Sequence, residues 1–404
     1  MTQVPWKDRY LLLSPDAALK NLETPCVYHI AKDDLYEIDE AAAAFLQSCN
    51  GTRTGRALTE DEEFVSYCLE EGILATLPRP EKADIFMGEK TAPSLRYLEL
   101  QLTHRCNLRC GHCYIGQPPR VLDMPPETAA AVVREFSDMG GLRLLVSGGE
   151  PLLYGPLDEF FSAVRDLPVR RVLFTNATLL DAQAMARIDV HEIQFSLDGW
   201  KTGHELLRGA GTFERTIEGV RIAREYGVDI SFSTMIHAGN IGEFEQMAAF
   251  IAETGALEWG VDIPCQPGAH GTGENPAIDP ETWVPLMEYA FGGGIHGSSG
   301  KERGDGGFAC GRHLMTVGPD GRAAKCGFYM ADPVGSVREG VRACWERIEH
   351  VRLADLECRG CTFLSECRGG CRFRAPGPLA PDPVMCRLYD VSSRAGAEPA
   401  PEGS

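Results

Sequence analysis

The sequence predicts an α/β protein built on a parallel sheet, because six short apolar runs alternate with amphipathic helical patterns in its middle. Strands that alternate with helices form parallel sheets with right-handed crossovers. The expected strands are Leu95–Thr103, Leu142–Ser147, Arg171–Asn176, Glu192–Leu197, Asp229–Ile236 and Leu257–Pro264. The expected helices are Pro126–Met139, Leu157–Leu167, Phe213–Tyr226, Gly242–Thr254 and Pro280–Phe291.

A loop with three cysteines follows the first expected strand. Cys106, Cys110 and Cys113 are spaced Cys-x3-Cys-x2-Cys. Three thiolates on so short a loop can hold three irons of a cubane cluster and leave the fourth iron open for chemistry. Zinc is the alternative, since His104 and His112 lie nearby, although zinc sites usually pair their ligands as Cys-x2-Cys knuckles or as Cys-x2-Cys with His-x3-His.

The second expected strand ends in the segment Ser147-Gly148-Gly149-Glu150-Pro151. A glycine pair at a strand end lets the backbone approach a ligand closely, and the glutamate offers an acceptor for an ammonium group. Together with the run from Thr103 to Tyr114, this segment resembles the cluster loop and the GGEP motif of the radical S-adenosylmethionine (SAM) superfamily. The resemblance implies an open, partial (β/α)6 barrel in which the three loop cysteines hold a [4Fe-4S] cluster that binds SAM.

The same resemblance implies which residues contact SAM. They are Tyr114, Ser147, Gly148, Gly149, Glu150, Asn176, Ser196 and Arg208. Ligands of such barrels bind at the C-terminal strand ends, where Asn176 and Ser196 lie. For Thr175 and Asp198, at the same strand ends, bonds within turns are an equally good expectation.

Seven cysteines in the last third of the chain resemble the SPASM extension of radical SAM enzymes that modify ribosomal peptides and proteins. The resemblance implies two auxiliary [4Fe-4S] clusters. The outer cluster would bind Cys358, Cys361, Cys367 and Cys386, and the inner cluster Cys310, Cys326 and Cys371. A zinc ribbon is the alternative, because two of these cysteines form a Cys-x2-Cys pair.

The inner set is one ligand short of four. The inner cluster therefore either keeps an open iron or takes a fourth ligand from Cys344, Cys265 or His313. An open iron could bind a substrate cysteine as its thiolate, which would suit an enzyme that forms thioethers. Cys344 is expected to be a buried structural thiol. Cys265 follows the sixth expected strand, so it is a candidate catalytic residue as well as a candidate buried thiol.

The N-terminal part has a different pattern. The expected strands are Tyr10–Leu13, Val27–Ile30 and Leu35–Ile38, with helices Glu40–Ser48 and Asp61–Glu70 and a closing strand at 72–77. This order resembles the PqqD-like winged-helix element that binds the leader of a precursor peptide as an added strand on a sheet edge. Winged helices also bind DNA, but this part is acidic and would repel phosphate.

These patterns divide the chain into six parts. We expect a peptide-recognition domain at 1–78, a linker at 79–94, the radical SAM core at 95–291, a glycine-rich linker at 292–307, the SPASM domain at 308–390 and a disordered tail at 391–404.

The composition of the chain argues against some classes of binding partner. The 404 residues carry a formal net charge of −19, so nucleic acid and anionic membranes are unlikely partners. The sequence shows neither a signal peptide nor an apolar run that could span a bilayer. Fifteen cysteines in such a chain favour metal ligation in a reducing, cytoplasmic compartment over disulfides.

Together the resemblances imply a radical SAM maturase that uses a 5′-deoxyadenosyl radical to modify a ribosomally made precursor peptide. Oxidative cross-linking, through a thioether or a carbon–carbon bond, is the expected reaction, with flavodoxin or ferredoxin as the reductant. The alternatives are a peptide epimerase, a sulfatase-type protein maturase and an enzyme that modifies small molecules or tetrapyrroles. A non-catalytic iron–sulfur carrier would need neither the glycine–glutamate segment nor an open iron.

Overall fold

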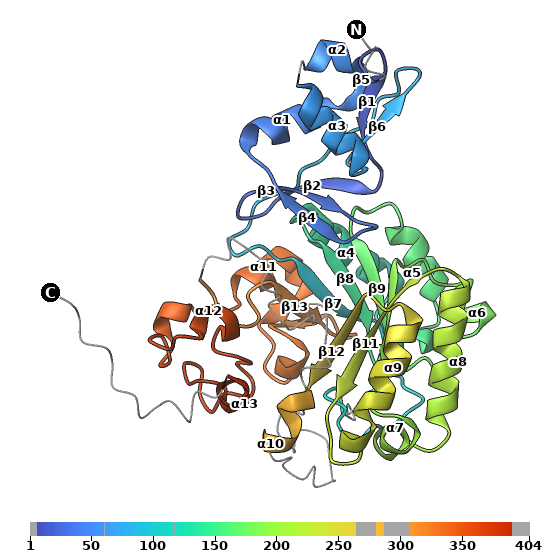
Figure 1. Cartoon of the computed structure of the whole chain (residues 1–404), viewed down its shortest axis with the longest axis vertical. Coiled ribbons are helices and arrows are strands. Elements are labelled where there is room, and N and C mark those ends of the chain that lie inside the picture. Colours follow the sequence, from blue (N-terminus) through green and yellow to red (C-terminus); the bar gives the residue numbers. More distant parts are fainter. Residues whose placement is uncertain are drawn as a thin grey trace, which may run out of the picture.

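The computed structural model describes residues 6–59, 61–116, 118, 120–263, 280–286 and 307–389. Its centre is a nine-stranded sheet in the order β12-β11-β10-β9-β8-β7-β13-β14-β15 (Figure 1). The first six of these strands are parallel to one another. They are β7 (Tyr97–Gln101), β8 (Arg143–Ser147), β9 (Arg170–Thr175), β10 (Glu192–Ser196), β11 (Asp229–Met235) and β12 (Glu258–Asp262). All six predicted strands are confirmed, and they differ from the prediction only at their ends.

Helices connect the parallel strands and cover the outer face of the sheet (Figure 1). They are α4 (Pro126–Asp138), α5 (Leu157–Val164), α6 (Ala182–Met185), α7 (Lys201–Arg208), α8 (Thr212–Glu225) and α9 (Phe244–Thr254). Their apolar sides and the strands form one large core. A short helix, α10 (Pro280–Trp283), follows β12. The short helices α6 and α7 were not predicted, and of the expected helix at 280–291 only α10 lies within the described residues. No described helix has the length and apolar character needed to cross a membrane.

A seventh parallel strand joins the sheet from the cysteine-rich end of the chain. Strand β13 (Leu314–Val317) pairs in parallel with β7, Leu314 opposite Tyr97 and Val317 opposite Leu100. Strands β14 (Arg322–Ala324) and β15 (Gly335–Ser336) continue the sheet in antiparallel fashion. The remaining helices of this part are α11 (Val341–Glu346), α12 (Leu364–Cys367) and α13 (Pro383–Leu388). The sequence analysis missed β13, which sets the C-terminal cysteines beside the strand that leads into the first cysteine loop.

We call residues 6–77 the N-terminal module. It contains two three-stranded sheets, β5-β1-β6 and β2-β3-β4. Its elements are β1 (Tyr10–Leu13), β2 (Ala17–Asn21), β3 (Pro25–His29), β4 (Asp34–Glu37), α1 (Glu40–Ser48), β5 (Asn50–Thr54), α2 (Gly55–Leu58), α3 (Glu62–Glu70) and β6 (Leu74–Leu77). The expected strands and helices are confirmed. Strands β2 and β5 were missed because neither shows the alternation of apolar and polar residues by which a strand is recognised.

The N-terminal module packs against the N-terminal ends of the parallel strands, with its β2-β3-β4 sheet nearest to them (Figure 1). Lys20 Nζ donates to the carbonyls of Gly141 and Pro168, both at 2.7 Å. The guanidinium of Arg170 donates to the carbonyls of Ile30 and Ala31. In the turn between β3 and β4, Asp33 forms an ion pair with Arg143, the first residue of β8. Buried polar contacts therefore connect the module to the sheet.

We predict that Asp33→Asn destabilises the protein by about 3 kcal/mol, because removal of one partner leaves a buried guanidinium without its main counter-charge. Asparagine tolerates the left-handed backbone of this residue, whose φ is 60°, so the turn itself should survive. Urea unfolding measures the change. Asp34→Asn, at the exposed neighbouring position, is the control, and equal midpoints for the two variants would refute the importance of this ion pair.

Candidate active site

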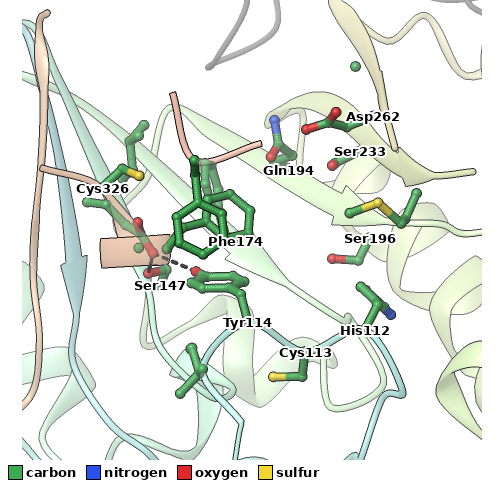
Figure 2. Close-up of a pocket in the computed structure, with 18 of the residues that line it drawn as sticks. His112, Cys113, Tyr114, Ser147, Phe174, Gln194, Ser196, Ser233, Asp262 and Cys326 are labelled. Carbon is green, nitrogen blue, oxygen red and sulfur yellow. Dashed lines mark hydrogen bonds between the residues drawn. The ribbon is translucent and has the colours of Figure 1, made fainter. Parts of the chain in front are cut away.

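A single large cavity of about 1390 Å³ lies at the C-terminal ends of the parallel strands and extends along the face of the sheet opposite the helices (Figure 2). All three cysteines of the loop after β7 line it. So do all eight residues predicted to contact SAM, namely Tyr114, Ser147, Gly148, Gly149, Glu150, Asn176, Ser196 and Arg208. The fold thus gathers around one space side chains that are far apart in sequence.

Hydrogen bonds to neighbouring strand ends hold the cysteine loop in place. Asn107, between the first two cysteines, accepts a bond from Asn176 Nδ2 at 3.1 Å and donates to Thr178 Oγ1 at 2.8 Å. The amide of Gly111 donates to the carbonyl of Leu207 at the end of α7. The loop is therefore tied both to the end of β9 and to α7. Sequence reasoning missed Asn107, because nothing in its neighbourhood signals a partner so distant in sequence.

The glycine pair after β8 allows two backbone segments to approach each other. The amide of Gly149 donates to the carbonyl of Thr103 at 2.8 Å, and the amide of Glu150 donates to the carbonyl of Arg105 at 2.7 Å. A Cβ at Gly148 would lie 2.6 Å from the Thr103 carbonyl oxygen, and one at Gly149 would lie 2.3 Å from that of Arg105. The sequence analysis expected the glycines to admit a ligand. The structure shows that they admit the start of the cysteine loop.

Glu150 is a buried carboxylate, 1% exposed, between two strand ends. It accepts bonds from Thr175 Oγ1 at 2.8 Å, from the amide of Asn176 at 2.9 Å and from the amide of Leu152 at 3.1 Å. Burial raises its pKa to about 6, while these three donors act in the opposite direction. A carboxylate has about four acceptor positions. One position therefore remains for a donor in the cavity.

Arg208, Asp198 and His112 form a buried polar group on the other side of the loop. The Arg208 guanidinium pairs with Asp198, whose carboxylate also accepts a bond from the amide of Met235 at 2.7 Å. Burial alone would raise the pKa of Asp198, but Arg208, His112 and this amide lower it to about 2. Burial lowers the pKa of His112 to about 4. Asp198 thus bonds to other groups of the protein. Arg208 lines the cavity, and its guanidinium is already paired with the Asp198 carboxylate.

Glu99 is a further functional residue that sequence reasoning did not single out. This β7 side chain is 6% exposed and accepts bonds from Tyr114 at 2.6 Å, from Ser147 at 2.8 Å and from Thr316 at 2.7 Å. It therefore connects the cysteine loop, β8 and β13. The hydroxyls of Tyr114 and Ser147, both predicted to contact SAM, donate to Glu99 in this structure (Figure 2). A charged residue inside the run Leu-Glu-Leu-Gln-Leu was the available signal.

The C-terminal cysteines line two neighbouring cavities. Cys310, Cys326 and Cys371 line the main cavity, and the thiols of Cys310 and Cys371 are in contact. Cys358, Cys361, Cys367 and Cys386 line a small cavity of about 10 Å³, and Cys367 also lines the main cavity. Asp382 lies between the groups, accepting bonds from the amide of Cys371 at 2.8 Å and from that of Val384, in the helix that carries Cys386.

The candidate fourth ligands of the inner group lie in different places. His313 lines the main cavity, whereas Cys344 is fully buried in α11 and lines neither cavity. Cys265 lies outside the described residues. Among the residues that the structure describes, no three His, Cys, Asp or Glu side chains converge closely enough to hold one metal ion.

The cavity has a polar and an apolar wall. Gln194, Ser196 and Ser233 lie with Asp262 on one side of Phe174 (Figure 2). Glu258, at the start of β12, lines the end of the cavity nearest the N-terminal module. Leu145, Phe174 and Leu314 belong to one apolar cluster and also line the cavity. Of this polar wall, the sequence analysis had identified only Ser196 as a site residue.

Residues 100–251 match the model of the radical SAM superfamily. A radical SAM domain implies SAM and a [4Fe-4S] cluster as cofactors. The loop of Cys106, Cys110 and Cys113 supplies a fitting donor set for the cluster, since three thiols of one loop line the cavity that also holds the Glu150 carboxylate. Burial raises the pKa of the Cys110 thiol to about 11, so iron would have to displace a proton on binding.

Two curated relatives are enzymes. The AdoMet-dependent heme synthase of Methanosarcina barkeri is 27% identical over 322 residues, which cover 69% of this chain and 92% of that protein. The PqqA peptide cyclase of Gluconobacter oxydans is 30% identical over 163 residues, which cover 39% of this chain and 46% of the cyclase. The chain likewise spans about half of the length of the AdoMet-dependent heme synthase of Nitratidesulfovibrio vulgaris.

Among solved structures, Streptococcus suis SuiB bound to the precursor peptide SuiA is similar over almost the whole chain. The match has a TM-score of 0.69 at 17% identity and covers 93% of this chain and 99% of that chain. At this identity the match establishes the fold.

We predict that Gly149→Ala displaces the start of the cysteine loop and costs about 2 kcal/mol, since its Cβ would overlap a backbone carbonyl that cannot rotate away. Thermal unfolding measures the loss, and hydrogen exchange of the Glu150 amide should become faster. Gly155→Ala is the matched control, because a Cβ there meets nothing within 4 Å. Equal stability of both variants would show that the loop adapts freely.

A second prediction concerns Glu258. Burial is the main cause that raises its pKa from 4.5 to about 7; Glu192 and Asp33 add to the rise, and Arg143 opposes it. A raised carboxyl pKa stabilises the fold at low pH, and this contribution is lost as the pH rises toward 7. Glu258→Gln should therefore gain about 2.5 kcal/mol relative to the parent protein between about pH 5 and about pH 8. Urea unfolding at both pH values measures this, with Glu253→Gln on the exposed face of α9 as the control. A constant difference would contradict the raised pKa.

Proposed function

We propose that this protein is a radical SAM maturase that modifies a ribosomally made precursor peptide, most simply by oxidative cross-linking. The observation that carries the proposal is that one cavity is lined both by the cysteine loop and by four C-terminal cysteines. Its volume of about 1390 Å³ also exceeds the roughly 300–1,000 Å³ of sites for small molecules. This leaves room for a peptide segment beside the cofactor.

The residues around the loop would hold the cofactor. Cys106, Cys110 and Cys113 would bind three irons of the cluster, and the free acceptor position of Glu150 suits an ammonium group. Asn176, Ser196 and Arg208 lie around the same space and would contact the rest of SAM. When bound, the cluster and SAM supply a 5′-deoxyadenosyl radical. The chain's own contribution is to position a target C–H bond and to exclude water.

The C-terminal cysteines would hold two auxiliary clusters in a SPASM domain. Cys358, Cys361, Cys367 and Cys386 line one small cavity, as an outer four-cysteine site requires. Cys310, Cys326 and Cys371 supply three ligands for an inner site. His313 supports a fourth ligand better than Cys344, because His313 shares the main cavity. An inner cluster with an open iron remains the other form of this proposal, and it suits a thioether product.

The N-terminal module would recognise the leader of the precursor. Strand β4 forms one edge of the β2-β3-β4 sheet, so it offers unpaired backbone groups to an added strand. Two comparisons support a peptide substrate, since one relative is a PqqA peptide cyclase and SuiB was solved with its precursor peptide. Binding of the leader here would raise the local concentration of the core peptide at the cavity. Flavodoxin or ferredoxin would supply the electron.

Modification of a tetrapyrrole is the second candidate. The heme synthase of Methanosarcina barkeri matches over 92% of its length, so the relationship extends beyond the radical SAM domain. The deciding experiment is anaerobic incubation with SAM, a reductant and the small peptide encoded beside the gene, in heavy water, followed by mass spectrometry. Loss of two hydrogens with two residues joined supports cross-linking, and gain of one deuterium indicates an epimerase. An unchanged peptide despite deoxyadenosine formation would favour the tetrapyrrole candidate.

We predict that Cys106→Ala abolishes deoxyadenosine formation, because two thiolates cannot hold the cluster with its open iron. Deoxyadenosine is measured by chromatography and mass spectrometry, and bound iron by elemental analysis. Cys344→Ala is the control, since this cysteine lines neither cavity. Unchanged deoxyadenosine formation by Cys106→Ala would overturn the assignment of the loop.

A further inference from the structure

The end of the main cavity nearest the N-terminal module holds a buried carboxylate, one oxygen of which receives no hydrogen bond from the described residues. Glu258 is 7% exposed, and within the described part of the chain its Oε1 atom has no hydrogen-bond partner. Gly260, two residues along β12, also lines the cavity and carries no side chain. Gln194 and Ser233 complete this polar corner. Buried carboxylates are normally paired, so an unpaired one at the end of a cavity marks a place for a ligand.

The charges around this corner are unbalanced. Arg170 contacts Glu192 at 3.2 Å and Asp229 at 2.7 Å, while Arg143 contacts Asp33 and lies 4.0 Å from Glu192. When Glu258 is included, four carboxylates therefore lie near two guanidinium groups, those of Arg143 and Arg170. Glu192 is satisfied further by Ser231 Oγ at 2.6 Å. Arg143 opposes the rise in the pKa of Glu258, but within the described residues no group donates a hydrogen bond to Glu258 Oε1.

We propose that this corner, lined by Glu258, Gln194, Ser233 and Gly260, is a subsite for a cationic side chain of the substrate peptide, a lysine or an arginine. The proposal rests on the proposed function in that it takes the substrate to be a peptide. The ammonium or guanidinium group contacts the Glu258 carboxylate, and the two other polar side chains complete its hydrogen bonds.

The shape of the cavity agrees with such a side chain. Leu145 and Phe174 form an apolar wall, which suits the methylene stem of lysine or arginine. Side chains that face the cavity from one strand are about 7 Å apart along that strand. A peptide bound beside Ser233 would therefore be close enough for one of its long side chains to reach Glu258. Burial keeps the pKa of Glu258 near 7 in the empty cavity, and a bound cation would hold the group ionised. A shorter or anionic side chain could not satisfy this carboxylate.

Small probes test the subsite without turnover. The probes are n-butylammonium, the neutral 1-butanol and the anionic butyrate, and their binding to the full chain is measured by saturation-transfer NMR. We expect n-butylammonium alone to bind, and its Kd to rise about tenfold in Glu258→Gln. Gly260→Val should also block it, although it keeps the carboxylate. Glu253→Gln, on the exposed face of α9, should change nothing. Equal binding of the three probes, or unchanged binding to Glu258→Gln, would overturn the proposal.

Measuring the turnover of peptide variants then tests the subsite separately from the proposed function. The substrates are precursor variants in which each core position in turn carries lysine, arginine or norleucine. We expect one position at which the cationic residues raise kcat/KM, and we expect Glu258→Gln to remove that preference while norleucine peptides react as before. Modified peptides without any cationic preference would overturn the subsite alone. If no peptide is modified, the proposed function fails, and the probe binding still decides whether the corner takes a cation.

Discussion

The site depends on the close backbone contact between the ends of β7 and β8. The amides of Gly149 and Glu150 donate to the carbonyls of Thr103 and Arg105, so the glycine segment and the start of the cysteine loop form one continuous piece of structure. Either segment alone would be an exposed loop with unsatisfied backbone groups. Joined, they hold Glu150 against the end of β9 and place the three cysteines above it. Any side chain at Gly149 would separate the two, because the facing atoms belong to the main chain.

The second constraint on the site is that charged side chains line the inner face of the sheet. A packed core would be apolar, yet Glu99, Glu150, Asp198 and Glu258 all line the cavity. Three of these carboxylates receive bonds that offset the cost of burial: hydroxyls for Glu99, a hydroxyl and amides for Glu150, and Arg208 for Asp198. Each bond also ties one chain segment to another. The same groups thus stabilise the fold and orient the site, whereas no described group donates such a bond to Glu258 Oε1.

Prediction from sequence succeeded where the signal was local. The six parallel strands are apolar runs, so they were recognised, and the loop of Cys106, Cys110 and Cys113 was recognised by its spacing. Pairing partners distant in sequence were not. Strand β13 is four residues long, and its place beside β7 follows from packing of the C-terminal part rather than from its composition. Asn107 and Glu99 were missed for the same reason, since their roles depend on Thr178 and Thr316, which only the fold brings near. Strand β2 likewise forms because β3 offers it a partner, not because of its own pattern.

The N-terminal module cannot be treated as a separate attachment to the catalytic part. Arg143 contacts Asp33 of the module and also lines the cavity, while Lys20 and Arg170 tie the two parts by bonds to main-chain carbonyls. Removal of the module would leave Arg143 with one distant carboxylate and would open the N-terminal end of the sheet to water. Loss of activity after such a truncation would therefore not distinguish a missing leader site from a damaged cavity. Single substitutions that spare Lys20 and Asp33 are therefore the changes that can separate recognition from catalysis.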